Sequence, residues 1–183
     1  MFPFVDIPPQ QQERVVCSII AAVKYEIPAN ILLAVAEKES GKPGQWVLNS
    51  NGTHDVGQMQ FNTGYISDLS KYGITASDVA ASGCYSFDLA AWRLRGHINH
   101  DKGDLWTKAA NYHSRKPKHN AIYRADLIVK ASKWADWLET RFTTVNITSN
   151  ASENPMSTTT NQNSQRKETG YVPRTITIKT QTQ

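Results

Sequence analysis

Apolar residues recur at helical spacing through most of this chain, and that pattern limits the folds open to it. Between residues 10 and 25 they lie three or four positions apart, at Val15, Val16, Ile19, Ile20 and Val23. Similar spacing predicts helices at residues 29–40, 63–71, 76–82, 86–100, 104–112 and 120–141. No alternating strand pattern precedes residue 144, and no internal repeat is present. The body of the protein is therefore predicted to be mainly α-helical.

The second predicted helix has clear start and stop signals. Pro28 suits its first turn, because proline lacks the N–H group that a helix start leaves unbonded. Gly41 and Pro43 lie just beyond its end, where both residue types terminate helices. The following residues, 41–62, are rich in Gly, Asn and Ser, which predicts a loop with room for a short hairpin.

The composition changes at residue 143. The 183 residues suffice for one domain with a core and leave a surplus. From residue 143 onward the chain is dominated by Thr, Ser, Asn and Gln, which bury too little apolar surface to offset the entropy of ordering. We expect one domain at residues 1–142 and a flexible, disordered polar tail at 143–183. Residues 175–179 alternate like a strand that could add to a partner's sheet, as an alternative to a wholly flexible tail.

The charge and the apolar segments exclude several classes of protein. The net charge of +4 favours a polyanionic partner, but Lys and Arg are scattered and form no nucleic-acid motif. We therefore expect no nucleic-acid partner. No stretch approaches the roughly 20 apolar residues that cross a bilayer. The N-terminus has no basic segment followed by an apolar run, so no secretory signal is predicted.

Helix 29–40 carries a carboxylate on its apolar face. Steps of three and four residues from Leu32 reach two further apolar residues and then Glu39. Burial and the partial negative charge of a helix C-terminus should both raise the pKa of Glu39, as a general acid near neutral pH requires. The alternative is a glutamate that ends the stripe and reaches solvent or a loop amide. Glu37 lies two positions earlier, faces elsewhere and is expected to be solvated.

This glutamate belongs to the first of three motifs that follow one another along the chain. They are Glu39-Ser40, the Gly-Gln-Met-Gln run at 57–60 and the Ala-Asn-Tyr-His-Ser run at 110–114. Together they resemble the catalytic domain of lytic transglycosylases of the soluble Slt type. More narrowly, they resemble the VirB1-like and IpgF-like enzymes that accompany type IV and type III secretion, conjugation and pilus systems. The resemblance spans about residues 10–142. It departs from the family at Gln58, where Leu or Ile is usual, and at Asn111-Tyr112, where the family has Tyr-Asn.

The resemblance implies a lysozyme-like α-domain of the goose-type and Slt kind, acting on peptidoglycan in the periplasm or cell envelope. Glu39 would protonate the bond between N-acetylmuramic acid and N-acetylglucosamine and then accept a proton from the sugar's 6-hydroxyl, giving a 1,6-anhydro product. The free carboxylates of peptidoglycan suit the positive charge of the chain. No metal or cofactor is implied, and a monomer is expected. The implied substrate-binding residues are Ser40, Gln58, Gln60, Asn111, Tyr112 and His113, with Tyr112 ranked above Asn111.

Asp55 is a candidate second carboxylate. It follows Glu39 by 16 residues and lies two residues before the Gly-Gln-Met-Gln run. Retaining glycosidases pair their acid with a carboxylate about 5 Å away, and lysozyme is the type example of that pairing. We therefore hypothesise that Asp55 gives electrostatic help and permits some hydrolysis. The alternative is a turn-forming aspartate that bonds the loop backbone.

The two cysteines, Cys17 and Cys84, are too few for a disulfide scaffold and wrongly spaced for zinc. From the residues alone they are two buried thiols, or one disulfide in an oxidising compartment. Members of the secretion-linked branch often carry a Cys in the first helix and another before a Tyr. The resemblance therefore implies a disulfide between Cys17 and Cys84.

The remaining candidates are histidines and tryptophans. His97 and His100 are too close in sequence for a metal pair on one helix face and are expected to be solvated. His113 is expected to line the groove beside Tyr112. Most tryptophans lie at helical spacing and belong to the core, so only Trp46, in the loop after Glu39, is a candidate sugar platform.

Three functions are consistent with the sequence. The first is a lytic transglycosylase that opens the wall locally for a secretion, conjugation or pilus apparatus. The second is a hydrolytic muramidase that uses Glu39 and Asp55. The third is a wall-binding assembly scaffold whose tail, residues 143–183, recruits secretion components.

Overall fold

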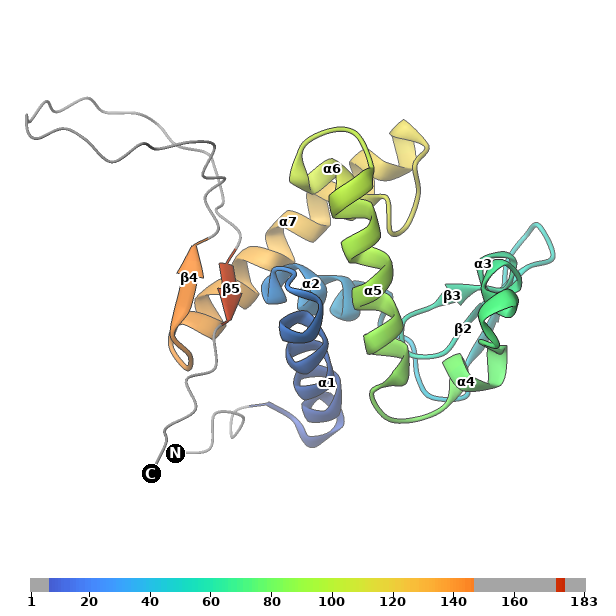
Figure 1. Cartoon of the computed structure of the whole chain (residues 1–183), viewed down its shortest axis with the longest axis horizontal. Coiled ribbons are helices and arrows are strands. Elements are labelled where there is room, and N and C mark those ends of the chain that lie inside the picture. Colours follow the sequence, from blue (N-terminus) through green and yellow to red (C-terminus); the bar gives the residue numbers. More distant parts are fainter. Residues whose placement is uncertain (1–6, 147–173, 177–183) are drawn as a thin grey trace, which may run out of the picture.

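The computed structural model describes residues 7–146 and 174–176, and helices dominate it (Figure 1). The helices are α1 (Pro9–Tyr25), α2 (Ala29–Glu39), α3 (Thr63–Leu69), α4 (Ala76–Ala80), α5 (Tyr85–His100), α6 (Leu105–Ala110) and α7 (Pro117–Glu139), with a 3₁₀ turn, η1 (Ser70–Tyr72). The strands are β1 (Trp46–Leu48), β2 (His54–Val56), β3 (Phe61–Asn62), β4 (Thr144–Asn146) and β5 (Arg174–Ile176). Each segment predicted to be helical contains a helix, so the mainly α fold is confirmed.

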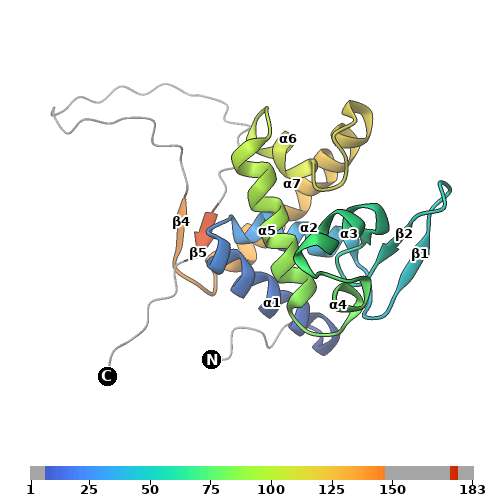
Figure 2. The ribbon, with the colours of Figure 1, turned by 45° about the vertical axis from the view of Figure 1, so that its right-hand side comes forward.

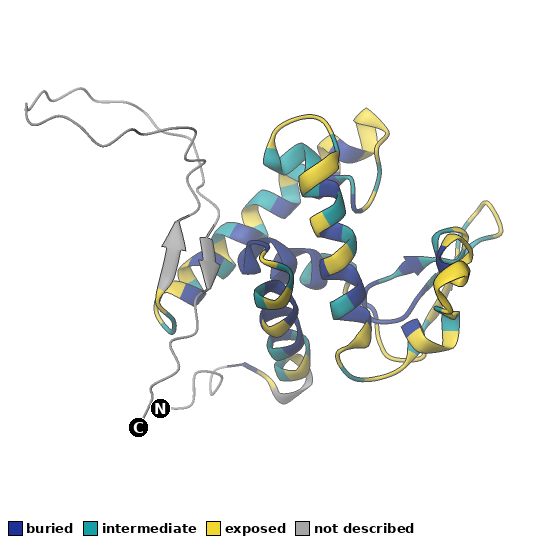
Figure 3. Ribbon diagram, viewed as in Figure 1, coloured by how far each residue is buried: buried dark blue, intermediate teal, exposed yellow. Residues whose placement is uncertain are grey.

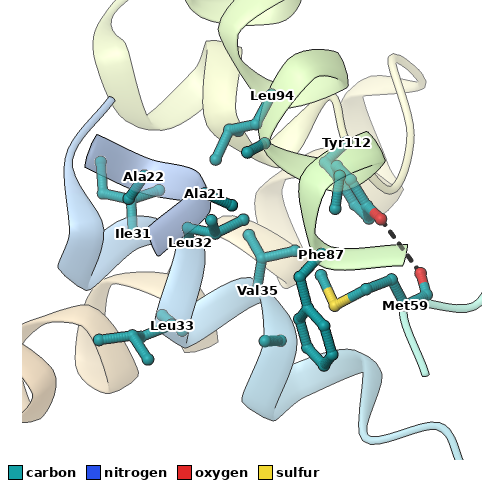
Figure 4. Packing of buried hydrophobic residues seen from close by; sticks show 14 of the residues in the cluster. Ala21, Ala22, Ile31, Leu32, Leu33, Val35, Met59, Phe87, Leu94 and Tyr112 are labelled. Atoms are coloured by element: carbon teal, nitrogen blue, oxygen red, sulfur yellow. Dashed lines mark hydrogen bonds between the residues drawn. The ribbon is translucent and has the colours of Figure 1, made fainter. Parts of the chain in front are cut away.

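Helix α2 lies at the centre of the body, with α1, α5 and α7 packed around it (Figure 1; Figure 2). Residues 29–36 of α2 are all buried, and a helix that is apolar around its whole circumference requires this surrounding layer. Figure 3 shows the buried stretch of α2 between partly exposed helices. In the core, Leu32 and Val35 of α2 lie near Phe87 and Leu94 of α5 (Figure 4). The end of α2 is therefore held from several sides.

The three strands after α2 form a small antiparallel sheet in the order β1-β2-β3. Val47 pairs with Asp55, and Asp55 pairs in turn with Asn62. Strand β1 is exposed along its length, and it extends away from the helices together with β2 (Figure 2). The sheet supplies the hairpin that was predicted within residues 41–62, and it places Asp55 on the middle strand.

A disulfide joins Cys17 of α1 to Cys84, the residue that precedes α5. The two Cα atoms are 4.9 Å apart, and the bond closes a loop of 67 residues. In the chain-entropy account, closing a loop of this size stabilises the folded state by about 4 kcal/mol. The bond ties α1 to the start of α5, and the loop that it closes includes α2 and the sheet.

Strands β4 and β5 form an antiparallel pair in which Val145 lies opposite Thr175. The strand considered at residues 175–179 is paired, in its described part, with β4 of this chain. Residues 147–173 and 177–183 lie outside the described residues, so the flexible tail at 143–183 stays an expectation. Among the residues that the structure describes, no helix is both long and apolar enough to cross a membrane.

Candidate active site

Glu39 is the last residue of α2 and receives a hydrogen bond from α7, 84 residues further along the chain. Tyr123 of α7 donates its phenolic hydroxyl to Oε1 of Glu39 at 2.6 Å. Tyr123 is buried, so this bond fixes the carboxylate from the core side. Ser40, directly after Glu39, adopts a left-handed conformation that ends the helix, and its N–H donates to the carbonyl of Ala36. The helix end therefore places Glu39 at a defined position beside the loop that follows.

The pKa of Glu39 is raised to about 7, with burial as the main cause. The hydrogen bond from Tyr123 and the positive charges of Arg93 and Lys38 favour the charged form and oppose the rise, whereas the negative charge of Asp55 adds to it. The raised pKa expected from the sequence is confirmed. A carboxyl group with this pKa is present in both protonation states near neutral pH, so it can donate a proton in one step and accept one in the next.

Two cavities meet at Glu39. One has a volume of about 350 Å³, and besides Glu39 it is lined by Asn49, Asp55, Gln60, Asn62, Arg93, Tyr112 and His113. The other has a volume of about 230 Å³ and is lined by Lys38, Glu39, His113, His119, Ile122 and Tyr123. Because Glu39 and His113 line both cavities, Glu39 lies where the two adjoin. A polymer bound through both cavities would place one of its bonds beside Glu39.

Asp55 lines the larger of these two cavities, together with Glu39. Its carboxylate accepts a hydrogen bond of 2.9 Å from the side chain of Asn62, and that amide also donates to Thr53 at 2.8 Å. Asp55 therefore lies in a strand and bonds a neighbouring strand's side chain, unlike the turn-forming aspartate that was the alternative. The negative charge of Asp55 is close enough to affect the pKa of Glu39.

Three of the predicted substrate-binding residues line this cavity: Gln60, Tyr112 and His113. Gln60 is held by a hydrogen bond of 2.8 Å from its side-chain amide to the carbonyl of Gly57. Tyr112 is buried, burial raises its pKa, and its hydroxyl donates to the carbonyl of Met59 at 3.1 Å (Figure 4). His113 is exposed and stacks on the Tyr123 ring with centroids 4.8 Å apart.

The other three predicted residues do not line either cavity at Glu39, and their role in substrate binding stays a prediction. Ser40 is exposed and its hydroxyl donates to the carbonyl of Glu37. Gln58 is buried and donates to the carbonyl of Gly83 at 3.3 Å. Asn111 donates to Asp101 at 2.8 Å and accepts from Asn120 at 2.8 Å. Each of these side chains holds backbone or a neighbouring helix, which leaves its polar atoms engaged away from the cavity.

Gly41, which follows the first motif, and Gly57, which begins the second, bring their backbones into direct contact. The N–H of Gly41 donates to the carbonyl of Gln58 at 3.2 Å. A Cβ atom on Gly41 would lie 2.0 Å from the carbonyl oxygen of Gly57, which no side chain tolerates. Gly57 itself has a φ of +72°, and a Cβ there would meet the carbonyl of Val79 at 2.4 Å. These close approaches bring Gln60 beside the end of α2.

The sequence analysis missed two residues of the site, Arg93 and Tyr123. Arg93 lies over the rings of Tyr65 and Tyr112, at 4.2 and 4.6 Å from their centroids. Both missed residues could have been found from the sequence, because each is a polar side chain at helical spacing from buried residues. Arg93 lies three residues after Ala90 and four before His97, and Tyr123 lies four residues before Leu127. The stripe reasoning that identified Glu39 would have identified them as well.

Trp46 and His97 lie in surroundings that differ from those expected from the sequence. Trp46 lies on the exposed strand β1, lines neither cavity at Glu39, and contacts His54 edge to face at 5.7 Å. His97 is only 7% exposed and its Nδ1 lies 2.7 Å from Asp101, so the expectation of a solvated His97 was wrong. It was wrong because His97 continues the buried stripe of α5. The described residues contain no cluster of His, Cys, Asp and Glu that could hold a metal ion.

Comparisons with known proteins agree on one family. Residues 16–126 match the family described as Transglycosylase SLT domain. The chain is 31% identical over 119 residues to Protein IpgF of Shigella flexneri, which covers 62% of this chain and 78% of that protein. It is 33% identical over 76 residues to Invasion protein IagB of Salmonella typhimurium, which covers 41% of this chain and 48% of that protein. Glu39, Asp55, Arg93, Tyr112 and Tyr123 all lie within the family match.

Proposed function

The chain belongs to the transglycosylase SLT family and is a peptidoglycan lytic transglycosylase, and from that premise we propose that Glu39 is both its acid and its base. The bond cut is the β-1,4 linkage between N-acetylmuramic acid and N-acetylglucosamine. The observation that carries this proposal is the carboxyl group of Glu39, whose pKa is about 7 and which borders two adjoining cavities.

In the first step, protonated Glu39 transfers its proton to the glycosidic oxygen. The bond from that oxygen to C1 of the muramic acid breaks, and its electron pair stays with the leaving sugar. Glu39 becomes a carboxylate, which the hydroxyl of Tyr123 stabilises by its hydrogen bond. The C1 centre carries partial positive charge, and the carboxylate of Asp55 in the same cavity offers it electrostatic stabilisation.

In the second step, the carboxylate of Glu39 accepts the proton of the 6-hydroxyl on the same muramic acid. The oxygen of that hydroxyl bonds to C1 and closes a 1,6-anhydro ring. Glu39 is protonated again, no water is consumed, and the cycle is complete. A single group can serve both steps because its pKa lies near the working pH and its position is fixed by α2 and Tyr123.

We further propose that this activity opens the wall locally for a secretion, conjugation or pilus apparatus in the periplasm or cell envelope. The similarity to IpgF and to the invasion protein IagB supports this role. The region from residue 143 onward, which follows the catalytic domain, is proposed to recruit components of the apparatus, and the enzyme is proposed to act as a monomer.

Product analysis tests the chemistry. Purified sacculi are digested in water enriched in ¹⁸O, and the released fragments are examined by mass spectrometry. We expect anhydro-muramoyl ends without ¹⁸O from the wild-type protein and no release by Glu39→Gln. Reducing muramoyl ends that carry ¹⁸O would instead identify hydrolysis, the reaction of the alternative muramidase.

A further inference from the structure

A further cavity, which the proposed mechanism does not use, lies between the end of α1, the η1 turn and the first half of α5. It has a volume of about 390 Å³. Among the described residues, none lines both this cavity and either cavity at Glu39. Its lining includes four aromatic side chains: Tyr25, Tyr72, Tyr85 and Trp92. We call it the aromatic cavity, and it is separate from the catalytic one.

Three of these aromatic side chains are exposed to solvent. The exposed fraction is 63% for Tyr72, 42% for Tyr85 and 44% for Trp92. Single exposed apolar residues are common on proteins, whereas several that gather at one cavity are typical of a binding surface. The two tyrosine hydroxyls and the indole N–H form no hydrogen bond with the part of the chain that the structure describes. Three hydrogen-bond donors therefore remain available beside exposed rings.

Asp88 is the one charged residue in the described lining of the aromatic cavity. Its Oδ1 accepts a hydrogen bond from Lys24 at 2.8 Å, and its Oδ2 accepts one from the hydroxyl of Tyr25 at 2.9 Å. Each carboxylate oxygen has two lone pairs, so each can accept one more hydrogen bond. The ammonium groups of Lys24 and Lys71 lie 5.0 Å from the ring centroids of Tyr25 and Tyr72. The charge of the carboxylate is thus already balanced, and two rings already contact a cation.

These groups together favour a neutral ligand with many hydroxyl or amide groups. A cation would meet two lysines, and an anion would meet a carboxylate. A purely apolar ligand would cover the tyrosine hydroxyls and the ion pair of Asp88 without replacing their hydrogen bonds to water. A sugar ring fits all of these groups, because its faces carry C–H groups that contact aromatic rings and its edges carry donors and acceptors.

We propose that the aromatic cavity is a second glycan-binding site, which binds the N-acetylated sugars of the wall while another stretch of glycan lies at Glu39. The rings of Tyr72 and Trp92 contact the faces of the sugars, and Asp88 accepts hydrogen bonds from their hydroxyl or amide groups. Binding at this site keeps the enzyme beside uncut strands and so raises their effective concentration at the catalytic cavity. The proposal rests on the proposed function in taking the glycan to be that of peptidoglycan.

The first test measures binding without cleavage. A peptide-free tetramer of N-acetylglucosamine is titrated into the full-length Glu39→Gln protein, and the tryptophan indole N–H resonances are followed by NMR. We expect the resonance of Trp92, assigned by its loss in Trp92→Phe, to shift until it saturates. Its dissociation constant should rise by about threefold or more in Tyr72→Ala. Ile20→Ala, an exposed apolar site of α1 outside the cavity lining, should leave that constant unchanged. A Trp92 resonance that stays in place, as expected if the cavity takes a partner protein instead, would overturn the proposal.

The second test compares cleavage of insoluble sacculi with cleavage of soluble glycan strands too short to reach both sites. In the double variant Tyr72→Ala/Trp92→Ala, we expect the initial rate on sacculi to fall by about fivefold and the rate on short strands to stay within about twofold of wild type. An equal loss on both substrates, or a wild-type rate on both, would overturn the proposal. If the Trp92 resonance shifts but the wild-type protein cleaves neither substrate, the second glycan site stands and the proposed function fails.

Discussion

Two carboxylates line one cavity and come from regions that differ in secondary structure and in burial. Glu39 comes from α2, whose residues 29–36 are all buried among other helices. Asp55 comes from the middle of a three-stranded sheet whose outer strand is exposed. A buried tyrosine from α7 fixes Glu39, whereas a half-buried asparagine from the adjacent strand fixes Asp55.

The difference indicates how the two groups divide the chemistry. Burial at the helix end raises the pKa of Glu39 to about 7, so Glu39 holds a proton that it can give away. Asp55 is an acceptor for Asn62 and adds to the pKa rise of Glu39 through its negative charge. In the proposed mechanism, the helical region therefore supplies the proton-transferring group and the sheet region supplies an electrostatic one. The following predictions test that division.

The largest effect is expected from Glu39→Gln, which keeps the shape of the side chain and removes its proton transfer. Turnover of purified glycan strands should fall by about a thousandfold or more, within the range that general acid–base catalysis contributes. The matched control is Glu37→Gln, two positions away, where the side chain accepts from Trp134 at 2.7 Å. It should stay within about twofold of the wild-type rate. Wild-type turnover by the Glu39→Gln protein would show that Glu39 does not transfer the proton.

Asp55→Asn should have a smaller effect, because it removes charge stabilisation and leaves proton transfer in place. We expect kcat to fall by about tenfold, or about 1.4 kcal/mol of transition-state stabilisation. Asp136→Asn on the exposed face of α7 is the control for loss of one negative charge. If kcat is unchanged in Asp55→Asn, then Asp55 is structural, and the sheet region only shapes the cavity.

The smallest effect is expected from Tyr123→Phe, which removes one hydrogen bond and keeps the ring that stacks on His113. The hydrogen bond stabilises charged Glu39 and lowers its pKa, so its loss should raise that pKa. In the proposed mechanism protonated Glu39 starts the reaction, so activity should be present below a pKa of about 7 and be lost as the pH rises through it. The basic limb of the kcat/KM profile should therefore move upward by about half a pH unit.

The control for that shift is Tyr25→Phe, which loses a hydroxyl bonded to Asp88 and not to Glu39. Its pH profile should match the wild type. A basic limb that stays in place in Tyr123→Phe, or moves to lower pH, would show that Tyr123 does not control the proton of Glu39.

The helices could be predicted closely because their signals are local. Periodicity and terminal glycines and prolines located each of them, although α7 begins at Pro117 and not at residue 120. The side chains that line the cavity were harder to predict, because the motif around Gln58 lies between short strands where side-chain direction changes from residue to residue. Gln58 and Gln60 are neighbours in one motif, yet one is buried against Gly83 and the other lines the cavity.

The sequence by itself determined which residues form α2 and that Glu39 continues its buried face, because both follow from the spacing of apolar residues along one helix. Only the tertiary structure decided which side chains lie around that carboxyl group. Tyr123 lies 84 residues further along the chain, and Arg93 and Asp55 come from two other elements. Their approach depends on how α5, α7 and the sheet pack around α2, and no local pattern specifies a contact over that separation.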